Sequence, residues 1–465
     1  MTLFSFIFSI IVFIIVILFV IIHPIIKIPR INKEIKIDYG IAPLIGVLIL
    51  IFSFNFHPSV IINGILGTSN IQPYAILILF MSLAYICISI DMTGLFSYLA
   101  LQAAKKSGGS GKKLFLYFFF LSSVLTIFTS NDIVILTITP IICYFAKHAK
   151  INPIPFLISQ FFAANIWSMM LYIGNPTNII VAQAYGLLFF EYTIWMFIPT
   201  LVAGFSCFFL LFQVFKKDIS NNIILPEINP KKELKDKNGA IFGVVILGTC
   251  LFFLSISPLL KVDMWLISVI FALIMFNRDI INQMILQKRQ NNKNTKPIIS
   301  KFETIKRIYA RMPWKIVPFI LGMFILVEIL TIVGWTSILS ESFSLFGNIT
   351  GFFPSILLMG YSSAFISNLM NNQPMTIFFT RMLQNTTIKN VSVRDGMIFA
   401  LIMGSNLGAN FTLIGALAGI MWSKITEDKG VKISFTQFAR YGFLIMPIVV
   451  FLSCFSLFLE IIFFR

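Results

Sequence analysis

Four polar residues in a row, Thr129-Ser130-Asn131-Asp132, interrupt a strongly apolar part of the sequence. The apolar runs on either side, 113–128 and 133–145, are short for membrane crossings, because a helix needs about 20 residues to span the hydrocarbon. The pattern predicts a helical hairpin that enters the membrane, turns at Ser130-Asn131 and leaves on the same side. The tip of such a hairpin leaves backbone groups unpaired, so we expect it to line a cavity.

A second hairpin with the same pattern is predicted over 351–384. Its apolar run reaches the polar group Ile366-Ser367-Asn368 and then continues through 371–374 (Asn-Asn-Gln-Pro). We place the tip of this hairpin at Ser367-Asn368, which makes Asn368 the predicted counterpart of Asn131.

Each predicted hairpin is followed by an apolar run that is too long for one crossing and is broken in its middle. The first run, 153–190, contains Gly-Asn-Pro-Thr-Asn at 174–178, and the second, 393–425, contains Gly-Ser-Asn-Leu-Gly-Ala-Asn at 404–410. Proline removes a helical hydrogen bond and glycine loosens the backbone, so each run predicts one crossing made of two half-helices around an unwound centre.

The composition is that of an integral membrane protein. Of the 465 residues, 58% are hydrophobic and only 11% are charged. The net charge of +17 comes from Lys and Arg in short loops, which the positive-inside rule explains without nucleic acid as a partner. The five cysteines lie in apolar runs without paired spacing, which predicts buried thiols and neither disulfides nor metal ligands. We expect a multi-pass protein of the cell membrane.

The positions of the basic loops predict how the chain is threaded. The first hairpin opens from the cytoplasm and the second from the exterior, so the two halves have opposite orientations. Such an inverted repeat is the architecture that secondary transporters use for alternating access. We predict an all-α polytopic membrane protein with about eleven crossings and two re-entrant hairpins. Its parts are a first helix and basic loop (1–38), a first repeat (39–216), a cytoplasmic linker (217–238) and a second repeat (239–465).

Hairpin tips and broken helices together predict a binding site near the middle of the membrane. Half-helix ends offer N–H groups to an anion, while unwound carbonyls and side-chain oxygens can hold a small cation. The alternative for each residue is that it caps a helix end. The candidates are Ser130, Asn131, Asp132, Asn175, Thr177 and Asn178 in the first repeat, and Ser367, Asn368, Asn406, Asn410 and Thr412 in the second.

Two carboxylates are candidates for coupling transport to a proton. A charge inside a membrane span is costly, and Asp132 follows the first tip directly while Glu328 lies inside the run 317–333. The alternatives are helix capping for Asp132 and a salt bridge or a helix bend for Glu328.

Motifs of enzymes are absent from the sequence. There is no phosphate-binding Gly-Lys-Ser loop, no His-Glu-x-x-His and no Gly-x-Ser-x-Gly. We expect a protein that is not an enzyme, does not hydrolyse ATP itself, needs no cofactor and binds no metal other than a transported sodium ion.

Several stretches of the sequence carry a resemblance to a known family: 130–132, 136–140, 164–166 and 173–181 in the first repeat, and 371–374, 407–410 and 413–416 in the second. In these stretches the chain resembles the arsenite permease and Na+/H+ antiporter group of the ion transporter superfamily, which also contains divalent anion:sodium symporters and citrate transporters. The resemblance implies a scaffold and a moving transport unit, often in a homodimer, with hairpin tips and unwound segments forming the site. At Asn406 the chain differs from arsenite permeases, which tend to carry an acidic residue there.

From these features we predict a secondary active transporter of the arsenite and anion permease type, driven by a proton or sodium gradient. Two alternatives keep the fold and change the cargo: Na+/H+ exchange, or transport of di- and tricarboxylates such as citrate. A passive anion channel is an alternative of another class, which the two opposed hairpins disfavour because each blocks the path from one side.

Overall fold

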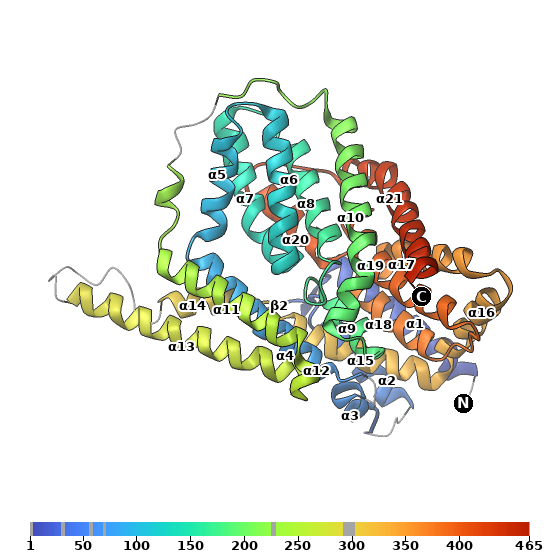
Figure 1. Cartoon of the computed structure of the whole chain (residues 1–465). Helices are drawn as coiled ribbons and strands as arrows, with labels where there is room; N and C mark the ends of the chain where they lie inside the picture. Colours follow the sequence, from blue (N-terminus) through green and yellow to red (C-terminus); the bar gives the residue numbers. More distant parts are fainter. Residues whose placement is uncertain are drawn as a thin grey trace.

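The computed structural model describes residues 3–28, 33–54, 59–67, 71–224, 229–291 and 303–464. Within these residues the fold is built from helices, as predicted (Figure 1). The exception is the basic loop after the first helix. There β1 (Ile25–Ile28) and β2 (Lys33–Lys36) pair as a short antiparallel ladder.

The elements of the chain are as follows. The N-terminal part contains α1 (Leu3–Ile22), the two strands, α2 (Ala42–Phe54) and α3 (Ser59–Leu66). The next seven helices are α4 (Pro73–Met92), α5 (Leu95–Lys106), α6 (Gly111–Phe128), α7 (Asn131–Ala149), α8 (Ile154–Trp167), α9 (Pro176–Ala184) and α10 (Phe189–Phe215). The middle of the chain holds η1 (Pro230–Lys232), α11 (Lys237–Ser255), α12 (Ser257–Leu260), α13 (Met264–Asn291) and α14 (Glu303–Arg311). The last part holds α15 (Ile316–Val333), α16 (Trp335–Ile349), α17 (Phe352–Met370), α18 (Asn372–Gln384), α19 (Val391–Leu407), η2 (Gly408–Asn410), α20 (Leu417–Asp428) and α21 (Phe435–Phe464).

The predicted repeats, 39–216 and 239–465, contain α4 to α10 and α15 to α21, which are seven α-helices each in the same order. The second helix of each hairpin begins at an equivalent position: α7 begins at Asn131 and α18 begins at Asn372. The second half-helix of each broken crossing begins at Pro176 for α9 and at Leu417 for α20. Both pairs are separated by 241 positions (131 to 372, and 176 to 417). The predicted equivalence of Asn131 with Asn368 is therefore wrong, and the counterpart of Asn131 is Asn372.

The tip of the second hairpin lies later than predicted. Ser367 and Asn368 belong to the last turn of α17, and the chain reverses at Asn371, whose φ is +71°. Asparagine tolerates this left-handed conformation better than most residues. Pro374 follows in the first turn of α18, where no N–H donor is needed. The pair Asn371 and Pro374, and not Ser367-Asn368, therefore ends one helix and begins the next.

The second unwound segment also lies later than predicted. Helix α19 continues through Gly404 to Leu407, a 3-10 turn follows over Gly408–Asn410, and α20 starts only at Leu417. Gly404 is a packing residue, because a Cβ added there would lie 2.6 Å from the carbonyl oxygen of Gly360 on α17. A glycine needed for close helix packing thus has the sequence pattern of a helix breaker.

The first unwound segment covers 168–175, and α9 begins at Pro176, where the missing N–H of proline costs nothing.

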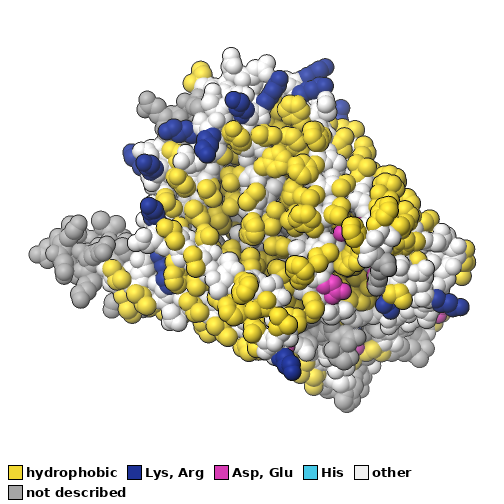
Figure 2. Space-filling view, viewed as in Figure 1, with side chains coloured by type: hydrophobic (Ala, Val, Ile, Leu, Met, Phe, Trp, Pro, Cys, Tyr) yellow, Lys and Arg dark blue, Asp and Glu magenta, His cyan; other side chains and the backbone are white. Residues whose placement is uncertain are grey.

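The surface fits a membrane protein. In the described part of the chain, ten helices are long and apolar enough to cross a membrane, among them three hairpin arms, α6, α7 and α17. Figure 2 shows a broad hydrophobic face and Lys and Arg gathered mainly at one end, over the ends of α5, α6 and α10. The positive-inside rule makes this the cytoplasmic end. We call it the inner end and the opposite one the outer end.

The two repeats interlock around the half-helices. Helix α20 of the second repeat packs against α7 of the first, and α9 of the first packs against α18 of the second (Figure 1). Each hairpin is therefore in contact with the broken crossing of the other repeat. This arrangement brings residues far apart in the sequence to one place in the centre of the protein.

Candidate transport site

Each hairpin tip is bound to the unwound segment of its own repeat by one backbone hydrogen bond. The N–H of Asn131 donates to the carbonyl of Gly174 over 3.3 Å, and the N–H of Asn372 donates to the carbonyl of Gly415 over 2.9 Å. Both bonds use a first-turn N–H that has no partner inside its own helix. The two bonds are again related by 241 positions, which supports the register taken from the helix starts.

A buried network of side-chain amides joins the two repeats. Asn131 Nδ2 donates to Asn165 Oδ1 over 3.0 Å, and Asn165 Nδ2 donates to Asn410 Oδ1 over 2.9 Å. All three side chains are at most 3% exposed. We call the whole network the central amide cluster, which consists of Asn131, Asn165, Ser168, Asn175, Asn178, Asn406 and Asn410.

Asn406 makes the largest number of hydrogen bonds between side chains within the cluster, three in all. Its Oδ1 accepts from Ser168 Oγ over 2.9 Å and from Asn175 Nδ2 over 3.0 Å. Its Nδ2 donates to Asn178 Oδ1 over 2.7 Å. Asn406 lies 241 positions after Asn165, so counterpart asparagines of the two repeats meet in one cluster. Because these side chains are fully buried, their hydrogen bonds hold the two broken crossings in a fixed relative position.

Other predicted site residues lie around the cluster. Thr177 Oγ1 accepts from Ser405 Oγ over 3.1 Å. At the second hairpin, Asn368 Oδ1 accepts from Thr412 Oγ1 over 2.6 Å and Asn368 Nδ2 donates to the carbonyl of Gly408 over 2.9 Å. Ser367 Oγ donates to the carbonyl of Ala364 in its own helix, as a local helix bond and not as a contact to the cluster.

Sequence reasoning missed several residues of the site. Asn165, Ser168, Ser405 and Asn372 were not among the candidates, although Asn372 Nδ2 donates to the carbonyl of Ser405 over 3.2 Å. The correct register would have found two of them, because Asn165 and Asn372 lie 241 positions from Asn406 and Asn131. Ser168 and Ser405 carry no comparable signal, since a lone serine in an apolar helix usually bonds its own backbone.

Two polar atoms beside the cluster have no hydrogen-bond partner within the described residues. They are Asn410 Nδ2 and Gln373 Oε1, one donor and one acceptor, on side chains that are at most 4% exposed. A buried polar atom without a partner is costly and rare, so water or a ligand is expected to complete it. The site can therefore offer both a donor and an acceptor to an oxygen-bearing cargo.

A cavity of about 580 Å³ leads from the inner end to the first hairpin tip. We call it the inner vestibule. Arg311, Trp314 and Lys315 line it at the junction of α14 and α15, and Ser130 and Asp132 line it at the tip. The two cationic side chains are paired, Arg311 with Asp91 and Lys315 with Asp38, each at 2.6 Å.

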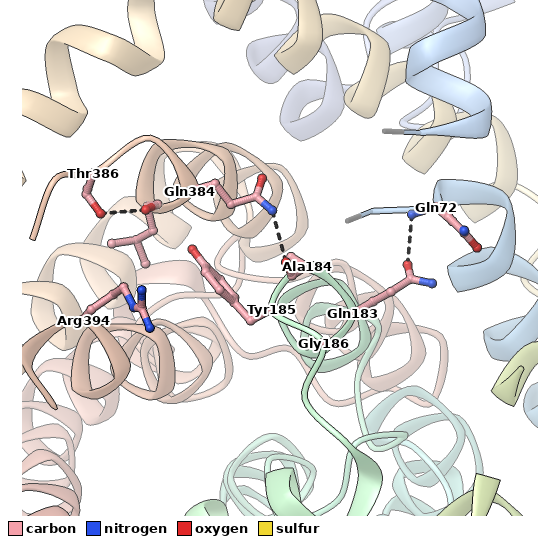
Figure 3. A pocket seen from close by; sticks show the side chains of 9 residues that line it. Gln72, Gln183, Ala184, Tyr185, Gly186, Gln384, Thr386 and Arg394 are labelled. Carbon is pink, nitrogen blue, oxygen red and sulfur yellow. Dashed lines mark hydrogen bonds between the residues drawn. The ribbon is translucent and has the colours of Figure 1, made fainter. Parts of the chain in front are cut away.

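A second cavity, of about 590 Å³, lies at the outer end. We call it the outer vestibule (Figure 3). The ends of α9 and α18 line it through residues such as Tyr185 and Gln384, together with Gln72 before α4 and Arg394 in α19. Gln72 and Ala184 here correspond, 241 positions on, to Pro313 and Ile425 of the inner vestibule. The two cavities are thus counterparts on opposite faces.

The two vestibules differ in depth. Asp132 and Leu136 line the inner one, whereas their counterparts Gln373 and Ile377 are 4% and 0% exposed and do not line the outer one. The structure is therefore open towards the inner end and closed towards the outer end. An inverted repeat in which one half is open and the other closed is the geometry of alternating access.

The two predicted coupling carboxylates have different surroundings. Asp132 lies in the first turn of α7, and among the described residues its carboxylate has no hydrogen bond or ion pair. Glu328, on α15, forms an ion pair with Arg381 of α18 at 3.2 Å. The salt bridge considered as an alternative for Glu328 is thus present.

The described residues contain no cluster of three or more His, Cys, Asp or Glu side chains that could hold a metal ion. The five cysteines are free, and all are buried, as their position in apolar runs predicts.

Comparison with known proteins agrees with this geometry. A family model described as "Citrate transporter" matches residues 1–402. The chain belongs to the citrate transporter family. This family member is 27% identical over 388 residues to the arsenical pump membrane protein of Escherichia coli K12, a match that covers 83% of this chain and 86% of the relative. It is 26% identical to the putative arsenical pump membrane protein of Bacillus subtilis, over 78% of this chain and 82% of that relative.

A solved structure also resembles this citrate transporter family member. The crystal structure of the YdaH transporter of Alcanivorax borkumensis aligns with a TM-score of 0.58 at 11% identity and covers 99% of both chains. At this identity the likeness concerns the fold alone. Together with the helices described above, these matches make the protein a multi-pass membrane transporter of the ion transporter superfamily.

Proposed function

We propose that this protein is a secondary active transporter of the arsenite and anion permease type, which moves its cargo by alternating access and is driven by a proton or sodium gradient. The observation that carries the proposal is the difference in depth between the two vestibules. The inner vestibule reaches the hairpin tip at Asp132, while the counterpart Gln373 is buried on the outer side. A channel would need a continuous path, which the closed outer half does not offer.

The chemistry of the central amide cluster bears on the cargo. Its members are uncharged amides and one hydroxyl, and helices α7, α9, α18 and α20 all begin near it, so that the positive ends of their dipoles favour oxygen atoms. Such a site suits a small neutral or singly charged oxygen compound, and arsenous acid fits this description. The names of the relatives from E. coli and B. subtilis favour the same cargo.

Carboxylate transport is the second candidate function. It is favoured by the description of the matching family and by the free donor at Asn410 Nδ2, which could meet a carboxylate oxygen. A cargo with two or three negative charges would need more positive charge around it than amides and helix N-termini provide.

Na+/H+ exchange is the third candidate. It would use the oxygen atoms of the cluster for sodium and the Asp132 carboxylate for the proton.

The coupling ion and the assembly belong to the same proposal. Asp132 faces the inner vestibule without a partner among the described residues, which suits a group that gains and loses a proton. We infer that the protein works without enzymatic chemistry on its cargo and as the homodimer that the family resemblance implies.

Transport by purified protein in vesicles tests the proposal. Labelled arsenite, phosphate, succinate and citrate are supplied one at a time, with an imposed pH gradient, an imposed sodium gradient or neither. We expect arsenite flux that saturates and depends on one of the two gradients. Citrate or succinate flux without arsenite flux would select the carboxylate candidate. Flux that continues unchanged after both gradients have collapsed, at more than about 10³ ions per second, would point to a channel, since kcat values are typically below this rate.

A further inference from the structure

An ion pair links the second hairpin to α15 close to the outer vestibule. Arg381 Nη2 on α18 lies 3.2 Å from Glu328 Oε2 on α15, and both side chains are only 13% exposed. The same guanidinium contacts Gln384 Oε1 through Nη1 at 3.4 Å. Gln384 lines the outer vestibule, so this ion pair lies beside the closed outer path.

Neutral hydrogen bonds close the same region. Gln384 Nε2 donates to the carbonyl of Ala184 at the end of α9 over 3.2 Å, as Figure 3 shows. Tyr185 Oη donates to the carbonyl of Thr380 on α18 over 3.4 Å. These bonds hold α9 against α18, while the ion pair holds α18 against α15. A cargo molecule in the cluster could leave through the outer vestibule only if α18 moved away from these neighbours.

The first repeat has no such ion pair in the equivalent place. At the offset of 241 positions, Glu328 corresponds to Cys87 and Arg381 to Pro140. Cys87 and Pro140 form no ion pair, and Ile88, next to Cys87, lines the open inner vestibule. The closed half of the molecule thus has a charge pair where the open half has two uncharged residues.

We propose that the Glu328–Arg381 ion pair is the latch of an outer gate, which stabilises the inward-open conformation and breaks when the transporter opens to the exterior. The latch rests on the alternating access proposed above. An interaction made in only one of two conformations shifts the equilibrium towards that conformation. A buried ion pair suits this role, because its partners are costly to separate once they have left water.

Two cysteine reporters measure which side is open. Leu136 lines the inner vestibule, and its counterpart Ile377 is fully buried on the outer side. In a cysteine-free background, Leu136→Cys should react with a membrane-impermeant maleimide supplied from the cytoplasmic side. Ile377→Cys should stay almost unreactive to the same reagent supplied from outside. The purified full-length protein in oriented vesicles is used throughout.

The double variant Glu328→Gln/Arg381→Gln removes the latch. It neutralises both partners, so that neither charge is left without its partner. We expect the labelling rate of Ile377→Cys to rise and that of Leu136→Cys to fall, each by about fivefold or more, the lower end of typical conformational couplings. The charge-swapped variant Glu328→Arg/Arg381→Glu should restore both rates towards the original values. The matched control is Glu427→Gln/Lys432→Gln, which removes an exposed ion pair 3.8 Å long and should change neither rate.

The opposite changes of the two reporters distinguish a latch from a structural contact. If the ion pair only stabilised the fold, its loss would raise both labelling rates and lower the melting temperature. Unchanged labelling of Ile377→Cys in a folded double variant would overturn the latch and leave alternating access standing. If Leu136→Cys does not react from the cytoplasmic side in the parent protein, alternating access itself fails in the form proposed.

Discussion

Asp132 is an acidic residue at the first hairpin tip whose carboxylate has no hydrogen bond or ion pair among the described residues. Its own backbone N–H is bound by Asn131 Oδ1 at 2.9 Å, so the neighbouring asparagine, and not Asp132, caps this turn of α7. A carboxylate kept inside a membrane domain costs about 2.5–3.5 kcal/mol on insertion scales, which favours a functional reason for its presence.

The first prediction concerns this carboxylate. Asp132→Asn should abolish transport or uncouple it from an imposed pH gradient, because asparagine keeps the shape of the side chain but cannot carry a proton. The protein should still insert, with a melting temperature close to that of the parent. Transport by purified protein in vesicles with a pH gradient is the measurement, and Glu341→Gln, at an exposed position of α16, is the matched control. Flux of Asp132→Asn that still follows the pH gradient would leave Asp132 without a coupling role and assign the coupling proton to another group, such as Glu328.

The second prediction concerns Asn406, which bonds Ser168, Asn175 and Asn178 at the centre of the cluster. Asn406→Ala would leave Asn175 Nδ2 and Asn178 Oδ1 without this partner, at about 1–3 kcal/mol for each group that finds no water, while Ser168 Oγ keeps its bond to the carbonyl of Asn165. We expect a lower melting temperature and a loss of transport, measured together in detergent and in vesicles. The control Asn222→Ala, at an exposed position, should change neither. Full transport by Asn406→Ala would show that the cluster is only structural.

Among the elements, the hairpins and broken crossings could be predicted from the sequence because polar groups and Gly-Pro pairs inside apolar runs have a direct physical meaning. Their boundaries in the second repeat could not. The turn at Asn371 depends on one residue with positive φ, and the helix through Gly404 depends on its packing against α17. Both are tertiary effects that a single sequence does not display. The short β1–β2 pair was missed for a similar reason, because its basic residues are also typical of a loop.

The third prediction tests the unwound segment of the first repeat. A Cβ added at Gly174 would run into the carbonyl oxygen of Ser168, a backbone atom that has no room to move. Gly174→Ala should therefore destabilise the protein by about 1–3 kcal/mol, the usual cost of overpacking, and impair transport by displacing the carbonyl that binds Asn131. Gly248→Ala in α11 is the matched control, since nothing lies within 4 Å of a Cβ there. Equal melting temperatures for the two variants would contradict the packing described for the segment.

For the whole molecule, the inverted repeat could be predicted because charge distribution and spacing are independent features of the sequence. What the sequence did not display is the conformational state. The two vestibules are lined by counterpart positions, and the difference between a half-buried Leu136 that lines the inner vestibule and a fully buried Ile377 arises from how the halves are packed, not from their composition. The ion pair between Glu328 and Arg381 is the clearest chemical difference between the two halves at these positions.

The last prediction fixes the orientation of the molecule in its membrane. Lys106, at the end of α5, and Lys232, in the linker between the repeats, lie at the basic end, while Asn348 lies near the end of α16 at the opposite face. Basic residues are retained in the cytoplasm, so cysteines introduced at Lys106 and Lys232 should react with an impermeant maleimide only after the cytoplasmic face is opened to the reagent. A cysteine at Asn348 should react in intact cells. The reverse pattern would exchange the two faces, and the deep vestibule that reaches Asp132 would then open to the exterior.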